Sequence, residues 1–350
     1  MKKFRNLNHN VTFSLIVAFI IGSIIITALG ENVFRVFGIL ISGAFDGSLK
    51  FGTTLQFFVP LFLTAIAFAV STKVDINNIG VEGSLLLGAI AAAVTGAYVT
   101  GLSPIFHISL ALIIAIVVGA AWAYIPAILK IKLNVNEITV TILLNYVALY
   151  FTSFLVMGPF SADVGAPRTM TILDSARIGT FLSPSKANYG IIIAIVVYFI
   201  ILFIFSKTTF GYKITNSGLN SKFSFFVGIN SKRMRIIGML ISGAIGGLAG
   251  GIEVLGVYGF YLYGFSFNTA FDGMLISLIA KNNLKKIPVI AFFIAALKSG
   301  ALSMARYTDI PKSTIDMLIS IFILLVAMDG IYEVIKNMVI RKKEREEAKC

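Results

Sequence analysis

Long apolar stretches separated by short polar segments extend along nearly the whole chain. A helix needs about 20 mostly apolar residues to cross the hydrocarbon core of a bilayer. Ten stretches meet or approach this length, and the short eighth one is expected to be tilted, broken or re-entrant. We predict spans over Val11–Leu29, Thr53–Ser71, Ile79–Val99, Ile105–Ile128, Ile138–Gly158, Tyr189–Ser206, Ile236–Val257, Thr269–Lys281, Ile287–Ala305 and Ser313–Val339.

The composition indicates that lipid, and not water, surrounds most of this chain. Of the 350 residues, 57% are hydrophobic and only 13% are charged, whereas soluble domains carry about 25% charged residues. A bilayer can cover so much apolar surface, and water cannot. The predicted fold class is therefore an all-α membrane protein, a polytopic bundle of about ten transmembrane helices.

The positions of Lys and Arg predict the orientation of these helices, because cytoplasmic loops accumulate both residue types. With the N-terminus inside and the helices alternating, 21 of the 29 basic residues fall in inside segments. We therefore predict that residues 1–10 and the charged tail 340–350 are cytoplasmic and flank a transmembrane domain over 11–339. The outside segments hold Arg35, Lys50, Arg168, Arg177, Lys186, Arg306 and Lys312, and Lys298 lies within a span.

The first apolar stretch has two interpretations. It follows the basic segment Met1–Arg5 and could therefore be a cleaved signal peptide. Because nine further spans follow, we favour an ordinary first transmembrane helix.

Charge and residue counts exclude several kinds of chemistry. The formal net charge is +13, but the basic residues lie between apolar runs, which indicates membrane topology and not a nucleic-acid partner. Cys350 is the only cysteine, and His9 and His107 are the only histidines. We therefore expect no disulfide, no metal site and no directly bound cofactor. No nucleophile motif accompanies the acids and bases, so we expect no catalytic residues.

Five polar residues within the predicted spans are candidates for a substrate pathway, because such residues are costly in a membrane. They are Glu82, Asn145, Glu253, Asp272 and Lys298. Packing roles are equally open for each one. Glu82 and Asp272 could cap helix starts, Glu253 could pair with Lys298, and Asn145 could hydrogen-bond between helices.

The seventh span contains a glycine repeat. Gly243, Gly247 and Gly251 recur at four-residue spacing, a pattern that lets helix backbones approach closely. A phosphate-binding Walker A loop would need Lys followed by Ser or Thr after its last glycine, and this run has neither. We assign these glycines to helix packing, so that ATP-driven transport would require a separate ATPase subunit.

Four motifs in order give the chain a family resemblance. Asn78–Gly88 (NIGVEGSLLLG) resembles the signature of ABC importer permeases in the ribose and branched-chain amino acid superfamily. Glu82 in this motif is typical of the nucleoside-type branch, the basic membrane protein-associated uptake systems. Asn136–Tyr146 (NEITVTILLNY) is similar to that branch, as are Phe271–Asn283 and Ala296–Ala301.

The resemblance implies a multi-pass permease subunit in a bacterial cytoplasmic membrane that forms a pathway for nucleosides. It also implies three partners: an ABC ATPase that uses ATP, a second permease chain (identical or homologous), and an extracytoplasmic substrate-binding lipoprotein. Residues 159–188 would form an external loop and 207–235 the ATPase-coupling loop. In the coupling loop Thr215, Ser221 and Phe223–Phe226 depart from the family pattern, whereas the matching residues are Gly211, Gly218, Asn220, Gly228 and Ile229.

Other functions stay open at this point. Within the family, the solute could be a sugar or another small molecule. An ion-coupled secondary transporter would use the membrane acids as cation sites, and would depend on an ion gradient instead of ATP. A membrane-embedded enzyme or a scaffold without transport activity are further alternatives.

Overall fold

The computed structural model describes residues 17, 19–162, 165–266 and 268–327, and regular structure in these ranges is helical. The chain divides into two compact units. Unit 1 comprises Met1–Asp46 and Ala296–Cys350, and unit 2 comprises Gly47–Ala295.

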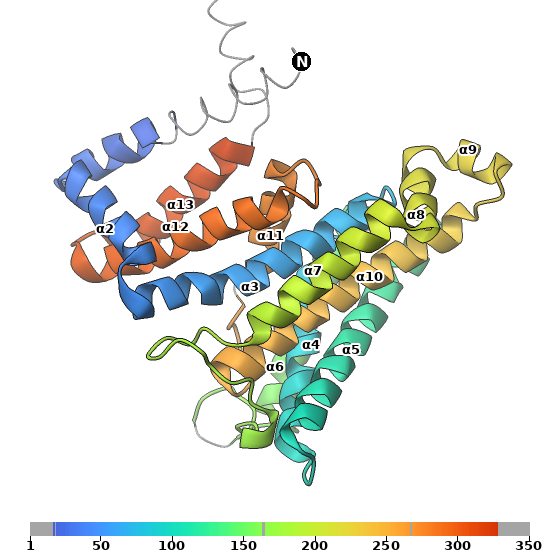
Figure 1. Cartoon of the computed structure of the whole chain (residues 1–350), viewed down its shortest axis with the longest axis horizontal. Helices are drawn as coiled ribbons and strands as arrows, with labels where there is room; N and C mark the ends of the chain where they lie inside the picture. The colour runs from blue at the N-terminus through green and yellow to red at the C-terminus, as the bar shows by residue number, and fades with distance from the viewer. Residues whose placement is uncertain (1–16, 18, 163–164, 267, 328–350) are drawn as a thin grey trace, which may run out of the picture. The chain divides into compact units, whose positions relative to one another are not determined.

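Unit 2 contains most of the long helices (Figure 1). The π-helix Val254–Tyr258 directly continues α10, and α12 runs across the division between the units. The helices of unit 2 are α3 (Gly47–Thr72), α4 (Val81–Tyr98), α5 (Pro104–Leu133), α6 (Glu137–Met157), α7 (Gly190–Lys207), α8 (Thr209–Leu219), α9 (Ser221–Phe226), α10 (Ser231–Glu253) and α11 (Thr269–Ile279), and α12 is Ile287–Tyr307.

Unit 1 contains a bent helix pair and the C-terminal helices. The helical segment Phe19–Ala28 and α2 (Val33–Phe45) meet at a bend of 118°. Their apolar residues pack with those of α12 and α13 (Lys312–Ala327) in one cluster. Asn32 begins α2 by accepting a hydrogen bond from the Arg35 backbone N–H at 3.1 Å.

The helices agree with most of the predicted spans. Seven described helices are long and apolar enough to cross a membrane, or eight if the bent pair counts as one span. The eighth predicted span is α11, whose 11 residues are too few to cross alone. Between the first two predicted spans lies α2, a helix of only 13 residues, which is too short to be recognised as a span from its length. Parts of the first and last predicted spans, and both predicted cytoplasmic ends, lie outside the described residues.

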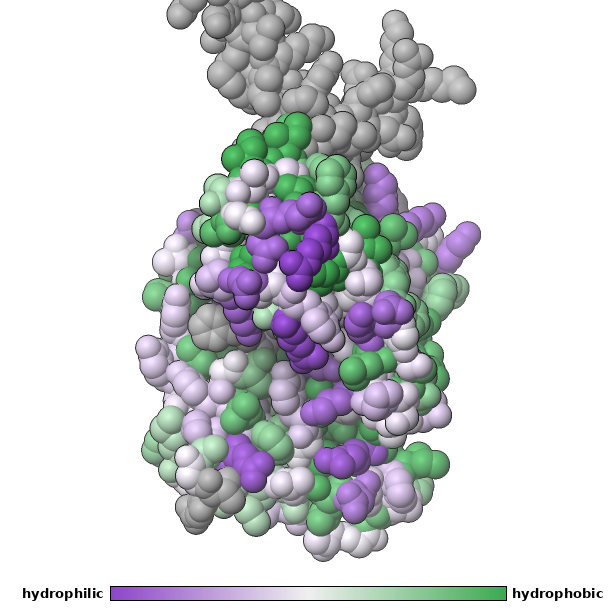
Figure 2. Space-filling model, turned by 90° about the vertical axis from the view of Figure 1, so that its left-hand side faces the viewer, coloured by the Kyte–Doolittle hydropathy of each residue, from purple (hydrophilic) through white to green (hydrophobic). Residues whose placement is uncertain are grey.

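Burial separates an inner group of helices from an outer group. In the most apolar windows of α3, α4 and α10, 78% of residues are buried. The corresponding fractions are 28% for α5 and α6 and 22% for α7. These outer helices expose apolar side chains such as Phe199 and Phe154, as expected where lipid is the solvent. The face of the molecule in Figure 2 shows hydrophobic residues, drawn in green, interspersed with hydrophilic residues, drawn in purple.

Glycines allow α4, α5 and α10 to pack backbone to backbone. A Cβ atom added to Gly247 of α10 would overlap the Ala115 carbonyl of α5, and one added to Gly88 of α4 would overlap the Gly247 backbone. Gly243 lies equally close to Gly119 of α5. Such contacts place whole helices at van der Waals distance over several turns.

One end of unit 2 is rich in Lys and Arg. A buried apolar cluster joins the start of the α3–α4 connection, the end of α5, α8 and the start of α10, through residues that include Val74, Ala127, Ile214 and Met234. We call this end the basic end, because it carries the following Lys and Arg residues: Lys73, Lys130, Lys132, Lys207, Lys213, Lys222, Lys232, Arg233 and Arg235.

Described residues of the 159–188 segment pack on the opposite end of the bundle. The backbone N–H of Leu173 donates to Gly96 at the end of α4, and that of Ile178 donates to Leu255 after α10, each within 2.9 Å. His107, near the start of α5, is buried and contacts Ser175 Oγ through Nδ1 at 2.9 Å. This loop and the 208–235 segment therefore lie at different ends of unit 2.

Candidate functional site

The eight-residue connection Lys73–Gly80, which we call the strap, links α3 to α4. Its Asn78 is 1% exposed and makes three hydrogen bonds. The side-chain amide donates to Ser242 Oγ of α10 at 2.9 Å, and the side-chain oxygen accepts from the Gly80 N–H at 3.1 Å. The Asn78 backbone N–H donates to Ser71 Oγ of α3 at 3.2 Å. The strap is therefore fixed to two inner helices.

Asn145 of α6 holds the point where the strap becomes α4. Its side-chain oxygen accepts from the Gly83 N–H and its amide donates to the Ile79 carbonyl, both at 2.9 Å. At 1.5 Å per residue, Asn145 lies about 12 Å along the helix axis from Glu137, where α6 begins. The polar contact is thus inside the bundle and not at its edge.

Removing this amide is expected to destabilise the protein. Asn145→Leu would leave the buried Gly83 N–H without its acceptor, which costs about 1–3 kcal/mol. We expect the midpoint of thermal unfolding of the purified chain to fall by several degrees. Asn145→Asp, which keeps the acceptor for Gly83 but loses the donor to Ile79, should have an intermediate midpoint. An unchanged midpoint for Asn145→Leu would contradict this assignment.

Glu82 connects the start of α4 to the start of α11. Its carboxylate accepts from the Ala270 backbone N–H at 2.8 Å and from Ser266 Oγ at 3.0 Å. The side chain is buried, with the residue 7% exposed. A carboxylate satisfies N–H groups at a helix N-terminus and interacts favourably with the helix dipole there. Glu82 therefore caps a helix start, but that of α11 instead of its own helix.

A cavity of about 320 Å³ lies beside this contact. Its lining combines apolar and aromatic side chains with a few polar groups, which is the usual composition of a small-molecule site. Glu82 and Asn145, proposed separately from the sequence, both line it. The lining residues are Glu82, Leu86, Ile142, Asn145, Tyr146, Leu149, Gly264, Ser266, Asn268 and Phe271.

The other three polar candidates are not among the residues that line this cavity. Asp272 is in the first turn of α11, next to the cavity residue Phe271. Glu253 is buried at the end of α10, where the π-helix begins, and is not among the cavity-lining residues. Lys298 belongs to unit 1.

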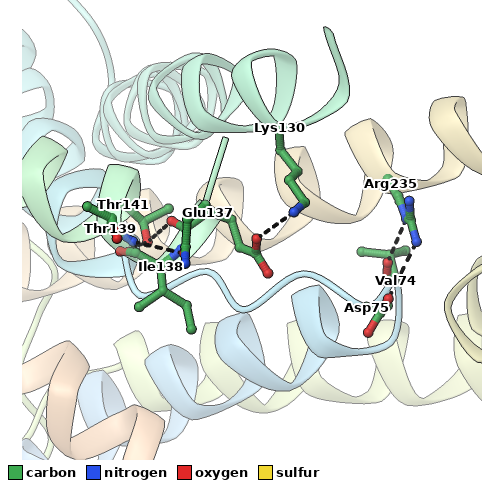
Figure 3. A network of polar contacts seen from close by, with 9 residues as sticks. Val74, Asp75, Lys130, Glu137, Ile138, Thr139, Thr141 and Arg235 are labelled. Carbon is green, nitrogen blue, oxygen red and sulfur yellow. Dashed lines mark hydrogen bonds and ion pairs between the residues drawn. The ribbon is translucent and has the colours of Figure 1, made fainter. Parts of the chain in front are cut away.

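The strap also contacts the predicted coupling loop, which contains α8 and α9. A Cβ atom added to Gly218 of α8 would overlap the Lys73 carbonyl. Arg235 at the start of α10 donates to the Val74 carbonyl and to Asp75 Oδ2, each at 3.4 Å (Figure 3). Burial lowers the pKa of Lys73 below its ordinary value.

Figure 3 also shows the connection between α5 and α6 at this end. Lys130 Nζ lies 3.0 Å from Glu137 Oε2. Asn136 begins α6 and accepts from the Ile138 N–H at 2.9 Å. Polar contacts between helices therefore stabilise the basic end in addition to its apolar packing.

The remaining coupling-loop residues have clear local roles. Gly211 lies against the Ile204 carbonyl of α7. Asn220 begins α9 by accepting from the Phe223 N–H at 2.9 Å. Gly228 ends α9 with a φ of +76°, a conformation that favours glycine, and Ile229 belongs to the apolar cluster of the basic end.

Exposed aromatic side chains distinguish this loop from an ordinary polar one. Phe225 is 77% and Phe226 is 85% exposed, and Phe223 is also exposed. Next to them lies a groove of about 550 Å³. An exposed apolar patch rimmed by basic residues is typical of a protein interaction site. The groove is lined by Ser221, Phe225, Gly228, Ile229, Asn230, Ser231, Lys232 and Arg235.

Sequence reasoning did not select four residues that the structure brings to these sites. Asn78, Tyr146 and Phe271 stand inside the quoted motifs, but their contacts depend on how distant helices pack. Asn268 precedes the eighth predicted span, and its only sequence signal is an amide residue at a helix start. No periodicity indicates that it faces a cavity.

Buried inner helices, apolar outer helices, a polar cavity and an exposed aromatic loop at one end define a polytopic membrane transport protein. The family described as "Branched-chain amino acid transport system / permease component" matches residues 50–328. The chain belongs to this family of ABC importer permeases, which are multi-pass proteins of the cytoplasmic membrane.

Individual relatives cover nearly the full length. The chain is 33% identical over 318 residues to the guanosine ABC transporter permease protein NupP of Bacillus subtilis (90% of this chain, 91% of the relative). It is 34% identical over 336 residues to the nucleoside ABC transporter permease protein NupB of Lactococcus lactis (92% and 91%). It is 27% identical over 322 residues to the glucose ABC transporter permease protein TsgB13 of Haloferax volcanii (89% and 84%). No solved structure matches the chain.

Proposed function

We propose that this permease carries nucleosides, and that the cavity beside Glu82 and Asn145 lies on their route. The observation that carries the proposal is the lining of this cavity, where aromatic rings stand beside amide and carboxylate groups. A nucleoside is a neutral molecule with a flat base and several hydroxyl groups. Aromatic faces suit the base, and hydrogen-bonding groups suit the hydroxyls and the base edge. The nucleoside permeases among the relatives support the same substrate class.

We assign the ATPase-docking role to α8, α9 and the exposed residues Phe223, Phe225 and Phe226. In this arrangement the basic end faces the cytoplasm, in line with the excess of Lys and Arg there. The termini would also be cytoplasmic, with ten spans in all. The external loop 159–188 would then face the substrate-binding lipoprotein.

The strap offers a physical connection between this docking surface and the cavity. Gly218 of α8 rests on the carbonyl of Lys73 at one end of the strap. The other end is held by Asn145 and continues into Glu82. We propose that a displacement of α8, driven by the ATPase, reaches the cavity through these contacts. Two permease chains, identical or homologous, would complete the pathway.

Reconstitution tests this function. The permease, its ATPase and its lipoprotein would be placed in proteoliposomes, and uptake of radiolabelled guanosine and of glucose would be measured with and without ATP inside. We expect ATP-dependent guanosine uptake at a rate at least about tenfold above that of glucose. Uptake of glucose alone would instead assign the chain to the sugar permeases.

Uptake that continues without ATP but stops when the ion gradient is collapsed would refute the ATP-driven mechanism altogether.

A further inference from the structure

The start of α11 is unlike the other helix starts that use asparagine. Five described helices have an Asn at the N-cap: Asn32, Asn136, Asn220, Asn230 and Asn268. In the first four, the side-chain oxygen accepts a hydrogen bond from a backbone N–H of the helix that follows, which is the usual reason for Asn at this position. The side chain of Asn268 makes no such capping bond.

The backbone explains this difference. The other four Asn residues have extended backbones, as N-caps normally do, whereas Asn268 is left-handed with φ 62° and ψ 17°. The helix start is instead satisfied by Glu82, which accepts from the Ala270 N–H. Glu82 therefore replaces the N-cap side chain of α11, and the Asn268 amide is not needed to cap this helix.

Glu82 also fixes the position of Asn268 from both sides. Ser266 and Ala270, two residues before and two residues after it, both donate to this one carboxylate. The Asn268 carbonyl accepts from the Asp272 N–H at 3.1 Å in the first turn of the helix. Two hydrogen bonds thus anchor Ser266 and Ala270, while the Asn268 side chain is exposed and lines the cavity. A left-handed non-glycine residue, held by its surroundings, often marks a functional position.

The surroundings of this amide indicate what it would contact. Tyr146, which is 57% exposed, and Phe271 line the same cavity. Aromatic faces of this kind stack on flat rings. A carboxamide carries two N–H donors and one acceptor oxygen, so it can recognise a ring edge that presents both kinds of group. A purine base offers a flat face together with such an edge.

We propose that Asn268 is a specificity-determining residue of this permease, hydrogen-bonding the base edge of the nucleoside while an aromatic side chain packs on its face. This inference rests on the proposed nucleoside function and assigns one residue within it. Nucleosides that differ only at the base edge are the ligands that the residue distinguishes.

Glycine is the informative substitution at this position. Asn268→Gly removes the amide and retains the left-handed conformation, which glycine adopts without cost. A role limited to the backbone would therefore survive this change, and a role of the side chain would not. Asn134 at the end of α5 provides a matched control, because it is also left-handed, at φ 50°, and exposed, but does not line the cavity.

The experiment measures initial uptake of guanosine, inosine and adenosine by the complete reconstituted complex. For the preferred nucleoside we expect Asn268→Gly to lower maximal rate divided by KM about tenfold, the scale of one substrate hydrogen bond. The ratio between the best and the worst of the three nucleosides should shrink by a similar factor. Asn134→Gly should leave both quantities unchanged.

Unchanged ratios among the three nucleosides would overturn the inference, even if all three rates fell together. If Asn268→Gly does not assemble, Asn268→Asp replaces it. Asp has nearly the same size as Asn and tolerates the same backbone conformation, but its carboxylate cannot donate a hydrogen bond. Its selectivity must then also change. A wild-type complex that transports no nucleoside would refute the proposed function itself, which separates that failure from a failure at Asn268.

Discussion

Replacing Glu82 with leucine is expected to reduce ATP-driven nucleoside uptake about 100-fold. The substitution removes the acceptor for the Ala270 N–H and for Ser266 Oγ. Loss of two hydrogen bonds to a buried charged group would cost about 3 kcal/mol, which corresponds to a factor of about 100. The turn that carries Asn268 would lose both of its anchors. Uptake by proteoliposomes, normalised to the amount of assembled complex on size-exclusion chromatography, measures the effect.

Glu82→Gln serves as the matched control, because it preserves the size of the side chain and one acceptor oxygen. Its uptake should lie between those of the wild type and Glu82→Leu. If Glu82→Leu transports within twofold of the wild type, the α4–α11 contact has no part in transport.

A bulky residue at Gly218 is expected to uncouple ATP hydrolysis from uptake. Gly218 leaves no space for a Cβ atom, which would overlap the Lys73 carbonyl, so Gly218→Leu must push α8 away from the strap. We expect nucleosides transported per ATP hydrolysed to fall at least about tenfold. Membrane insertion should be preserved, because the spans are unaffected. Parallel assays of phosphate release and uptake measure this ratio.

Gly228 offers a comparison within the same loop. Its φ is +76°, but no atom lies within 4 Å of an added Cβ. Conformation, and not space, therefore limits substitution there, and Asn tolerates that conformation. The number of nucleosides that Gly228→Asn transports per ATP hydrolysed should therefore stay close to that of the wild type. A normal ratio in Gly218→Leu would show that contact between α8 and the strap does not carry coupling.

Hydropathy was sufficient to place most of the helices. The segment Ile105–Ile128 became α5, Pro104–Leu133, and Ile138–Gly158 became α6, Glu137–Met157. Such agreement is expected, because the bilayer sets the length of an apolar helix. The same rule fails for short helices, and it missed α2, which has 13 residues.

The site could be predicted only in part. The high cost of polar groups in a membrane selected Glu82 and Asn145, and both line the cavity. The cost alone does not reveal the partner of each group, so the contact from Glu82 to Ala270, 188 positions along the chain, could not be foreseen. The left-handed conformation of Asn268 could not be predicted either, because it follows from that same tertiary contact.

The glycine contacts restrict how this permease can change shape. Helices whose backbones touch over several turns cannot slide past one another without steric overlap, so α4, α5 and α10 must travel as a single block. Opening and closing would then occur as a hinge at the periphery of that block. Within unit 2, the elements that would move relative to this block are α6 and α11, which contact α4 through the side chains of Asn145 and Glu82.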